Sequence, residues 1–183
     1  KLVDVDLDGL SDLVMVGSGI VRIWRNQDGT SWEEEFVEVA DSRIPLLTSS
    51  TFVTFEDMNG NGSTDIVWND PGNGIFLRYL ELHPTTKPNL LVEMRNGMGR
   101  RLNLEYRTTT DYWLEAEAAG NPWTAIPPFP IPVVSAFTEY DGMGSTYRTE
   151  VNYHNGYYDG PEREFRGFER AIQTEVGNDS QGA

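Results

Sequence analysis

Hydrophobic residues occur along the chain in short runs that glycine and proline interrupt, a pattern that predicts strands and turns rather than long helices. The apolar runs 12–16 and 20–26 are separated by Gly17–Gly19, which predicts a hairpin. The runs 65–70 and 74–83 flank a Pro-Gly-Asn turn in the same way. We therefore predict an all-β protein.

A second style of hairpin follows in segments 90–107 and 133–154, where apolar and polar residues alternate with a period of two. The first turns on NGMG and the second on DGMG, in which glycine supplies positive φ angles at low cost. Alternation predicts that the apolar face holds Leu102, Leu104 and Tyr106 in the first hairpin, and Tyr147, Val151 and Tyr153 in the second.

One helix is predicted over residues 111–120, with Asp111 as its N-terminal cap and Gly120 at its end. Five prolines exclude helix and central strand from residues 121–132, so that segment is expected to be extended. Residues 162–170 are interpreted as a strand. Simple alternation there would place Arg163, Phe165, Gly167 and Glu169 on one face and Glu164, Arg166 and Phe168 on the other.

Two stretches, DVDLDGLSD and DMNGNGSTD, crowd oxygen-bearing side chains at alternate positions with glycine at the sixth. A divalent cation would remove the repulsion between neighbouring carboxylates, and oxygen ligands at this spacing suit Ca²⁺. The expected ligands are Asp4, Asp6, Asp8, the Leu10 carbonyl and Asp12 in the first loop, and Asp57, Asn59, Asn61, the Ser63 carbonyl and Asp65 in the second. The second loop has fewer carboxylates, so weaker binding is expected there.

The alternative is that Asp, Asn and Gly simply form good turns. An EF-hand is excluded, because Met15 and Trp68 stand where its glutamate would be and strand patterns follow. A short loop followed by a strand resembles the FG-GAP/VCBS repeats of integrin-like propellers, whose loops bind calcium. The repeat of about 50 residues also suggests propeller blades, although two blades cannot close a propeller.

The formal net charge of −15 argues against binding to nucleic acid or anionic membranes. The chain has no cysteine, which excludes disulfides and cysteine nucleophiles, and its apolar runs are too short for a membrane span. Its two histidines, His83 and His154, have no serine arrangement that suggests a triad. Because the sequence opens inside a motif, we expect it to be a fragment of a longer protein.

The second half resembles the B component of bacterial Tc toxin complexes and the related SpvB-type and Rhs-like toxin proteins. The resemblance is carried by KPNLLVEMRNGMGRRLNLEYRTTTDYWLEAEAAGNPW, PFPIPVV and YHNGYYDGPEREFRGFERA, and covers roughly residues 87–174. It divides the chain into two propeller-type repeats, 1–86, and a middle region leading into shell strands, 87–183. Residues 83–88 are interpreted as the linker.

The resemblance implies a secreted, non-enzymatic part of a toxin-delivery protein. A propeller would dock on and gate an A-type translocator, and a β-rich shell, completed by a C-type subunit, would enclose a cytotoxic polypeptide. Neither nucleic acid binding nor direct membrane insertion is expected. Two alternatives remain from the residues alone: a calcium-dependent adhesion or carbohydrate-binding module, and a glycosidase that would need two carboxyl groups at catalytic separation.

Overall fold

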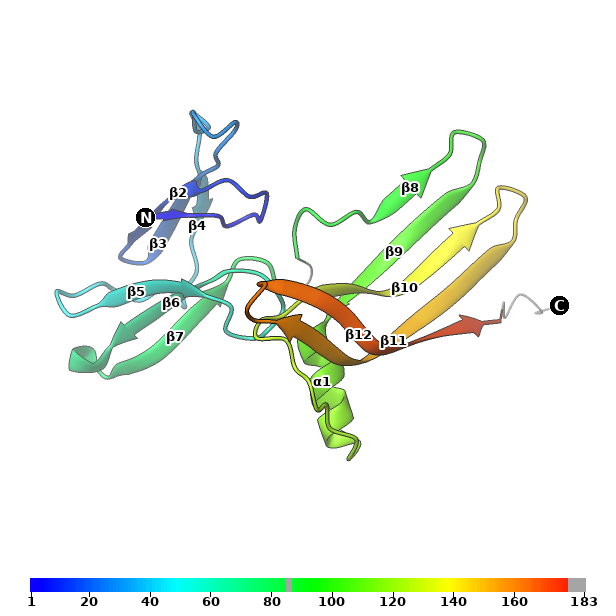
Figure 1. Cartoon of the computed structure of the whole chain (residues 1–183). Helices are drawn as coiled ribbons and strands as arrows, with labels where there is room; N and C mark the ends of the chain where they lie inside the picture. Colours follow the sequence, from blue (N-terminus) through cyan, green and yellow to red (C-terminus); the bar gives the residue numbers. More distant parts are fainter. Residues whose placement is uncertain (85–86, 178–183) are drawn as a thin grey trace. The chain divides into compact units, whose positions relative to one another are not determined.

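The computed structural model describes residues 1–84 and 87–177 (Figure 1). The prediction of an all-β protein is confirmed, since the described residues form antiparallel sheets and a single α-helix. The chain divides into two compact units, Lys1–Asn59 with Ser63–Asn89, and Gly60–Gly62 with Leu90–Ala183. Within the described part of the chain, no helix combines the length and apolar character needed to cross a membrane.

The first unit contains two antiparallel meanders. The four-stranded sheet has the order β1-β2-β3-β4 and the three-stranded sheet the order β5-β6-β7. The strands are β1 (Leu2–Val3), β2 (Asp12–Gly17), β3 (Ile20–Trp24), β4 (Val37–Val39), β5 (Phe52–Glu56), β6 (Asp65–Asp70) and β7 (Ile75–Glu81). A short 3₁₀ turn, η1 (Pro71–Asn73), joins β6 to β7 where the sequence predicts a turn.

The two acidic stretches occupy equivalent places in these sheets. Leu2 pairs with Leu13 and Val3 with Asp12 around the first loop. Phe55 pairs with Ile66 and Glu56 with Asp65 around the second. Each acidic loop is therefore a hairpin connection between two strands, and the repeat read from the sequence is a repeat in structure. Among the described residues these sheets do not close into a propeller.

The core of the first unit draws side chains from both of its sheets. Its buried members are Val5, Val14, Val21, Ile23, Ile44, Ile66, Trp68 and Leu80. Val21, Ile66 and Trp68 have no exposed surface at all. Burying one such side chain contributes about 1.5–3 kcal/mol, so this apolar cluster supplies most of the drive that holds the acidic loops in place.

The second unit is built on a five-stranded antiparallel sheet with the order β12-β11-β10-β9-β8. Its strands are β8 (Glu93–Arg95), β9 (Arg101–Thr108), β10 (Pro132–Tyr140), β11 (Thr146–Asp159) and β12 (Glu164–Val176). Both predicted hairpins are present, β8–β9 and β10–β11. The proline-rich stretch before β10 carries no helix and no strand up to Pro132, as expected.

The helix α1 (Thr109–Ala118) begins earlier than predicted. Thr108, not Asp111, is the N-terminal capping residue, and Asp111 stands at the third helical position. The Asp111 carboxylate accepts the Thr108 amide at 2.9 Å, so it still satisfies a free donor at the helix start. Gly120, with φ at +72°, follows the helix as predicted.

Strict alternation along residues 162–170 is wrong. The β11–β12 register shifts where Tyr157 and Tyr158 pair with Gly167 and Phe165, and Gly167 has φ at +111°. An extra residue in one strand rotates the following side chains. Phe165 and Phe168 therefore meet, with ring centroids 5.1 Å apart, instead of lying on opposite faces.

The NGMG and DGMG turns have matching internal bonds. Asn96 Oδ1 accepts the amides of Met98 and Arg100 at 2.8 and 3.0 Å. Asp141 Oδ1 accepts those of Met143 and Ser145 at 2.7 and 3.0 Å. The two turns also touch, because a Cβ atom on Gly142 would lie 2.9 Å from the Gly99 carbonyl carbon and oxygen.

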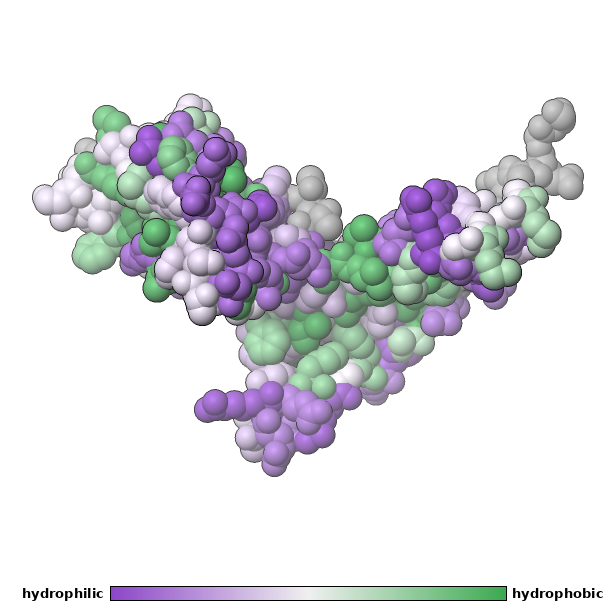
Figure 2. All heavy atoms as spheres, turned by 90° about the horizontal axis from the view of Figure 1, so that it is seen from above, coloured by the Kyte–Doolittle hydropathy of each residue, from purple (hydrophilic) through white to green (hydrophobic). Residues whose placement is uncertain are grey.

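Large apolar side chains lie open on the surface of each unit, and Figure 2 shows hydrophobic residues interspersed with hydrophilic ones on one face. Phe52 and Phe76 in the first unit are 70% and 76% exposed, and Met98 and Met143 in the second are each 88% exposed. These side chains stabilise neither unit in isolation.

Candidate functional site

The first acidic loop gathers Asp4, Asp6 and Asp8. One carboxylate oxygen from each lies within 4.8 Å of the others. The Oδ1 atoms of Asp4 and Asp6 are buried and have no hydrogen-bond partner among the described residues. Burial, followed by the charges of Asp12 and Asp8, raises the pKa of Asp6 above its ordinary value. Three predicted ligands therefore meet, and the environment disfavours the negative charge of Asp6.

The other two predicted ligands of this loop have structural contacts. The carboxylate of Asp12 is fully buried and accepts the amides of Val5 at 3.0 Å and Asn26 at 2.8 Å. The Leu10 amide donates to Asp8 Oδ1 at 2.7 Å. Each carboxylate oxygen of Asp12 retains a second lone pair, so these bonds leave its predicted role as a ligand open.

The second loop is organised differently. Asp65 is fully buried; its Oδ2 accepts the Met58 amide at 3.0 Å, and its Oδ1 has no partner among the described residues. Burial is the main reason that the pKa of Asp65 is raised, and the charge of Asp57 adds to it. Asn59 donates to Glu81 at 2.8 Å. Ser63 is also buried, whereas Asn61 lies in the Gly60–Gly62 segment of the second unit.

The first loop has the donor set that a hard dication requires. Ca²⁺ takes six to eight oxygen ligands, and Asp4, Asp6 and Asp8 offer carboxylate oxygens, two of them buried without a hydrogen-bond partner in the described part of the chain. The second loop presents only two carboxylates and no comparable acidic cluster is found in it among the described residues. The residues present thus fit calcium better in the first loop than in the second.

Two contacts to the first loop come from residues that the motif alone did not single out. His83 Nε2 lies 2.9 Å from the Val5 carbonyl oxygen, and Asn89 Nδ2 donates to the Asp6 carbonyl at 2.7 Å. His83 lies 78 positions from Val5, and Asn89 lies 83 positions from Asp6. No local sequence pattern could therefore have indicated these bonds. The only sequence signal is that His83 opens the predicted linker, 83–88, and that Asn89 follows it directly.

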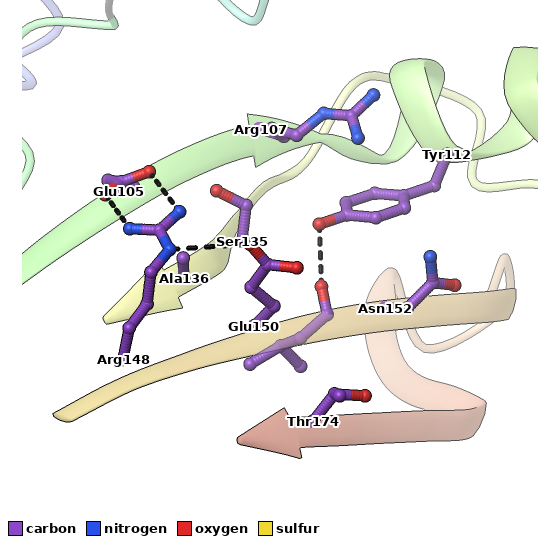
Figure 3. A pocket seen from close by; sticks show the side chains of 10 residues that line it. Glu105, Arg107, Tyr112, Ser135, Ala136, Arg148, Glu150, Asn152 and Thr174 are labelled. Carbon is purple, nitrogen blue, oxygen red and sulfur yellow. Dashed lines mark hydrogen bonds and ion pairs between the residues drawn. The ribbon is translucent and has the colours of Figure 1, made fainter. Parts of the chain in front are cut away.

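The second unit has a polar hollow of about 390 Å³ on its sheet (Figure 3). Arg148 forms a paired contact with Glu105 across the intervening strand, with Nη2 to Oε2 at 3.0 Å. This bonding lowers the pKa of Glu105. Tyr112 closes one side by donating its hydroxyl to the Val151 carbonyl at 2.8 Å. The hollow thus holds an internal ion pair, and the hydroxyls of Ser135 and Thr174 line it with no histidine or cysteine among the described lining residues.

Comparison with known proteins identifies the family to which this chain belongs. The model of the family described as "Insecticide toxin TcdB middle/N-terminal region" matches residues 29–183. The chain belongs to the TcdB insecticide toxin family. The matched part of this TcdB-type chain begins well before Lys87, where the sequence motifs become recognisable.

Solved structures of TcdB toxins agree with the family match. A crystal structure of TcdB2-TccC3 superimposes with a TM-score of 0.83 at 29% identity, covering 100% of this chain and 9% of that chain. A TcdB2-TccC3-Cdc42 structure gives 0.80 at 30% identity, covering 95% and 8%. A Photorhabdus luminescens Tc holotoxin pore gives 0.81 at 29% identity, covering 96% and 8%. No curated protein matches.

This TcdB-type chain therefore spans less than a tenth of the length of the solved toxin chains that it resembles. The prediction of a Tc toxin B component is confirmed at the level of the family.

Proposed function

We propose that this chain is a non-enzymatic structural segment of a secreted toxin-delivery protein. In this proposal the segment contributes to the docking and gating propeller and to the shell that encloses a cytotoxic polypeptide. Its partners would be a C-type toxin subunit and an A-type translocator. The observation that carries the proposal is the superposition over the full chain on TcdB2 in the structure with TccC3.

The architecture of the two units supports this assignment. The first unit consists of meander sheets whose hairpins carry the acidic loops, and the second of a broad antiparallel sheet on which several charged residues form ion pairs. Both offer frameworks and exposed apolar residues rather than a reactive centre. The structure of the Tc holotoxin pore also includes a mutated TccC3.

A chimaera tests the proposal. This chain replaces the matching segment of TcdB2, and the product is co-expressed with TccC3. We expect a folded chimaera that co-purifies with TccC3, with unmodified TcdB2 as the control. A chimaera that unfolds cooperatively on heating, and so is folded, but fails to co-purify would contradict the proposal.

The rival adhesion or carbohydrate-binding role receives no support from the comparisons. A glycan-binding screen of the isolated chain separates the two classes. Binding of one glycan class at micromolar affinity would favour the rival, and uniform absence of binding is expected. A glycoside hydrolysis assay with the same chain tests the proposed lack of enzymatic activity.

We also propose that the first acidic loop binds Ca²⁺ as a structural ion, with Asp4, Asp6 and Asp8 as side-chain ligands. The second loop is proposed as a weaker site. The supporting observation is the pair of buried, unpartnered oxygens on Asp4 and Asp6 within one carboxylate cluster. Arg25 Nε lies 3.8 Å from Asp6 Oδ2, a single positive charge against the three carboxylates of the cluster, and a dication there would supply more.

Calcium titration calorimetry and thermal unfolding test this part. At a hundredfold excess over Kd, a ligand of the folded state alone adds about 2.7 kcal/mol of stability. We expect that gain in the wild type, its loss in Asp6→Asn, and its retention in Glu34→Gln, which removes one exposed charge elsewhere. Equal stability of the wild type in calcium and in chelator, with no heat of binding, would contradict the proposal.

A further inference from the structure

Two residues that follow β7, His83 and Asn89, contact the first acidic loop. His83 follows β7 closely, and Asn89 is the last residue of the first unit before Leu90 opens the second. His83 contacts the Val5 carbonyl and Asn89 the Asp6 carbonyl, at 2.9 and 2.7 Å. The carbonyl oxygen only accepts, so His83 Nε2 must carry the proton in this contact.

Asp6 takes part in two structures at once. Its carboxylate belongs to the cluster with Asp4 and Asp8, and its backbone carbonyl is held by Asn89. Binding of the Asp6 side chain to an ion would therefore also restrict the position of the Asp6 carbonyl oxygen, which accepts the hydrogen bond from Asn89. The entropy of ordering this stretch of loop is lost once, whichever partner arrives first, and the second partner then binds at lower cost.

Asn89 is held in a demanding conformation. Its φ is +58°, in the left-handed region that asparagine tolerates better than most residues. Its side chain is bonded to a loop more than eighty residues earlier. The bond to Asp6 is thus one of the interactions that keep Asn89 in this geometry, and weakening the loop would release it.

His83 also reaches the second acidic loop. Its backbone carbonyl lies 3.4 Å from the Ser63 hydroxyl, which donates to it. In that loop Asp65 is fully buried with one oxygen lacking a partner among the described residues, an independent indication that a cation belongs there. His83 therefore contacts both loops, one through its ring and one through its main chain.

We infer that His83 and Asn89 form calcium-responsive contacts, in which filling of the first acidic loop strengthens the bonds of these two residues to Val5 and Asp6. The inference rests on the calcium part of the proposed function. Coupling of this kind is reciprocal: the factor by which calcium stabilises the contacts of His83 and Asn89 equals the factor by which these contacts strengthen calcium binding. His83 and Asn89 act as positioning residues and are not ligands themselves.

The test combines two readouts on the whole chain. Hydrogen exchange of peptides covering residues 83–91 is measured in calcium and in chelator, and calcium affinity is measured by calorimetry. Asn89→Gly tolerates the positive φ and removes the donor without adding charge beside the acidic loop, and His83→Ala removes the ring. A single net hydrogen bond corresponds to about a two- to tenfold change in an equilibrium constant, which sets the expected loss of affinity in each variant.

The controls separate coupling from damage. His154→Ala removes the other histidine, in the second unit, and should leave both readouts unchanged. His83→Gln retains a donor and should recover part of the affinity. Thermal unfolding in chelator verifies that each variant is folded.

The outcomes distinguish this inference from the proposal beneath it. If calcium slows exchange in residues 83–91 and both Asn89→Gly and His83→Ala bind calcium more weakly, the inference is supported. If the wild type binds calcium but exchange is unchanged and Asn89→Gly and His83→Ala bind as tightly, the inference is overturned while the calcium site stands. If the wild type binds no calcium, both are overturned.

Discussion

The buried carboxylate of Asp12 accepts the backbone amide of Val5 at 3.0 Å, which closes the first acidic loop across its whole length. Asp65 makes the same bond to Met58 at the same distance in the second loop. The last aspartate of each motif thus shapes the turn, whatever else it binds. The difference is that Asp12 also accepts the Asn26 amide.

Asp12→Asn should therefore destabilise the chain even without metal. An amide side chain can accept one of the two backbone donors but presents its own N–H groups to the other. Hydrogen bonds to charged groups are worth about 1.5–3 kcal/mol each, so we expect a loss of about 2–3 kcal/mol. Urea unfolding in chelator measures it, and Asp8→Asn, on the exposed side of the loop, should cost far less.

The raised pKa of Asp6 predicts a pH dependence in the absence of calcium. Between the ordinary pKa of an aspartate and the raised pKa of Asp6, the folded state binds more protons than the unfolded state. Stability contributed by Asp6 therefore falls as pH rises through that window and stays low above it. Asp6→Asn should remove this contribution, so the stability difference between variant and wild type should grow with pH in chelator.

Other carboxylates titrate in the opposite sense. The informative quantity is therefore the difference in stability between Asp6→Asn and the wild type at each pH. Bonds from Thr30 and Ser31 lower the pKa of Asp28 to about 2, and bonds from Arg43 do the same for Asp41. These groups stabilise the fold above their unfolded pKa and lose that effect as pH falls. A variant-minus-wild-type difference that is flat with pH would count against the electrostatic crowding of Asp6.

Gly142→Ala should destabilise the second unit more than Gly144→Ala. Both positions have positive φ, at +78° and +106°, and a side chain in the left-handed region costs about 1–2 kcal/mol. Only at Gly142 would the new Cβ also collide with backbone, 2.9 Å from Gly99, whereas Gly144 has open space. Chemical unfolding of the two variants measures the difference, and equal losses would show that the tips separate freely.

Tyr112→Phe should weaken the packing of helix α1 against strand β11. The variant removes the hydroxyl that donates to the Val151 carbonyl at 2.8 Å in a buried site. An unsatisfied buried acceptor costs about 1–3 kcal/mol, with the ring packing against Tyr153 retained. Thermal unfolding should show this loss, while Tyr147→Phe, an exposed tyrosine on the same strand, should be neutral.

The hairpins could be predicted because their turns carry local chemistry. Glycines in NGMG and DGMG, and the glycine pair flanking Ser18, impose reversals that neighbouring residues cannot override. The bulge near Gly167 could not be predicted in this way. It depends on how many residues the opposite strand presents, which a single segment does not reveal.

The same distinction between local and long-range determinants holds for the candidate site. The convergence of Asp4, Asp6 and Asp8 follows from spacing within nine residues, and it was predicted. The bonds from Asn26, His83 and Asn89 depend on tertiary packing and were not. The helix start was missed by a small margin because Thr108 and Asp111 share the capping role, and sequence favours either.

The contact between Gly99 and Gly142 fixes the separation of the two hairpin tips through main chain alone. The methionines beside them, each almost fully solvated, take no part in that spacing. Replacing both methionines by cysteine would thus give two attachment points for a pair of probes at a span that the scaffold dictates. Such a labelled chain would report any change in the distance between the two hairpin tips without disturbing the fold that carries them.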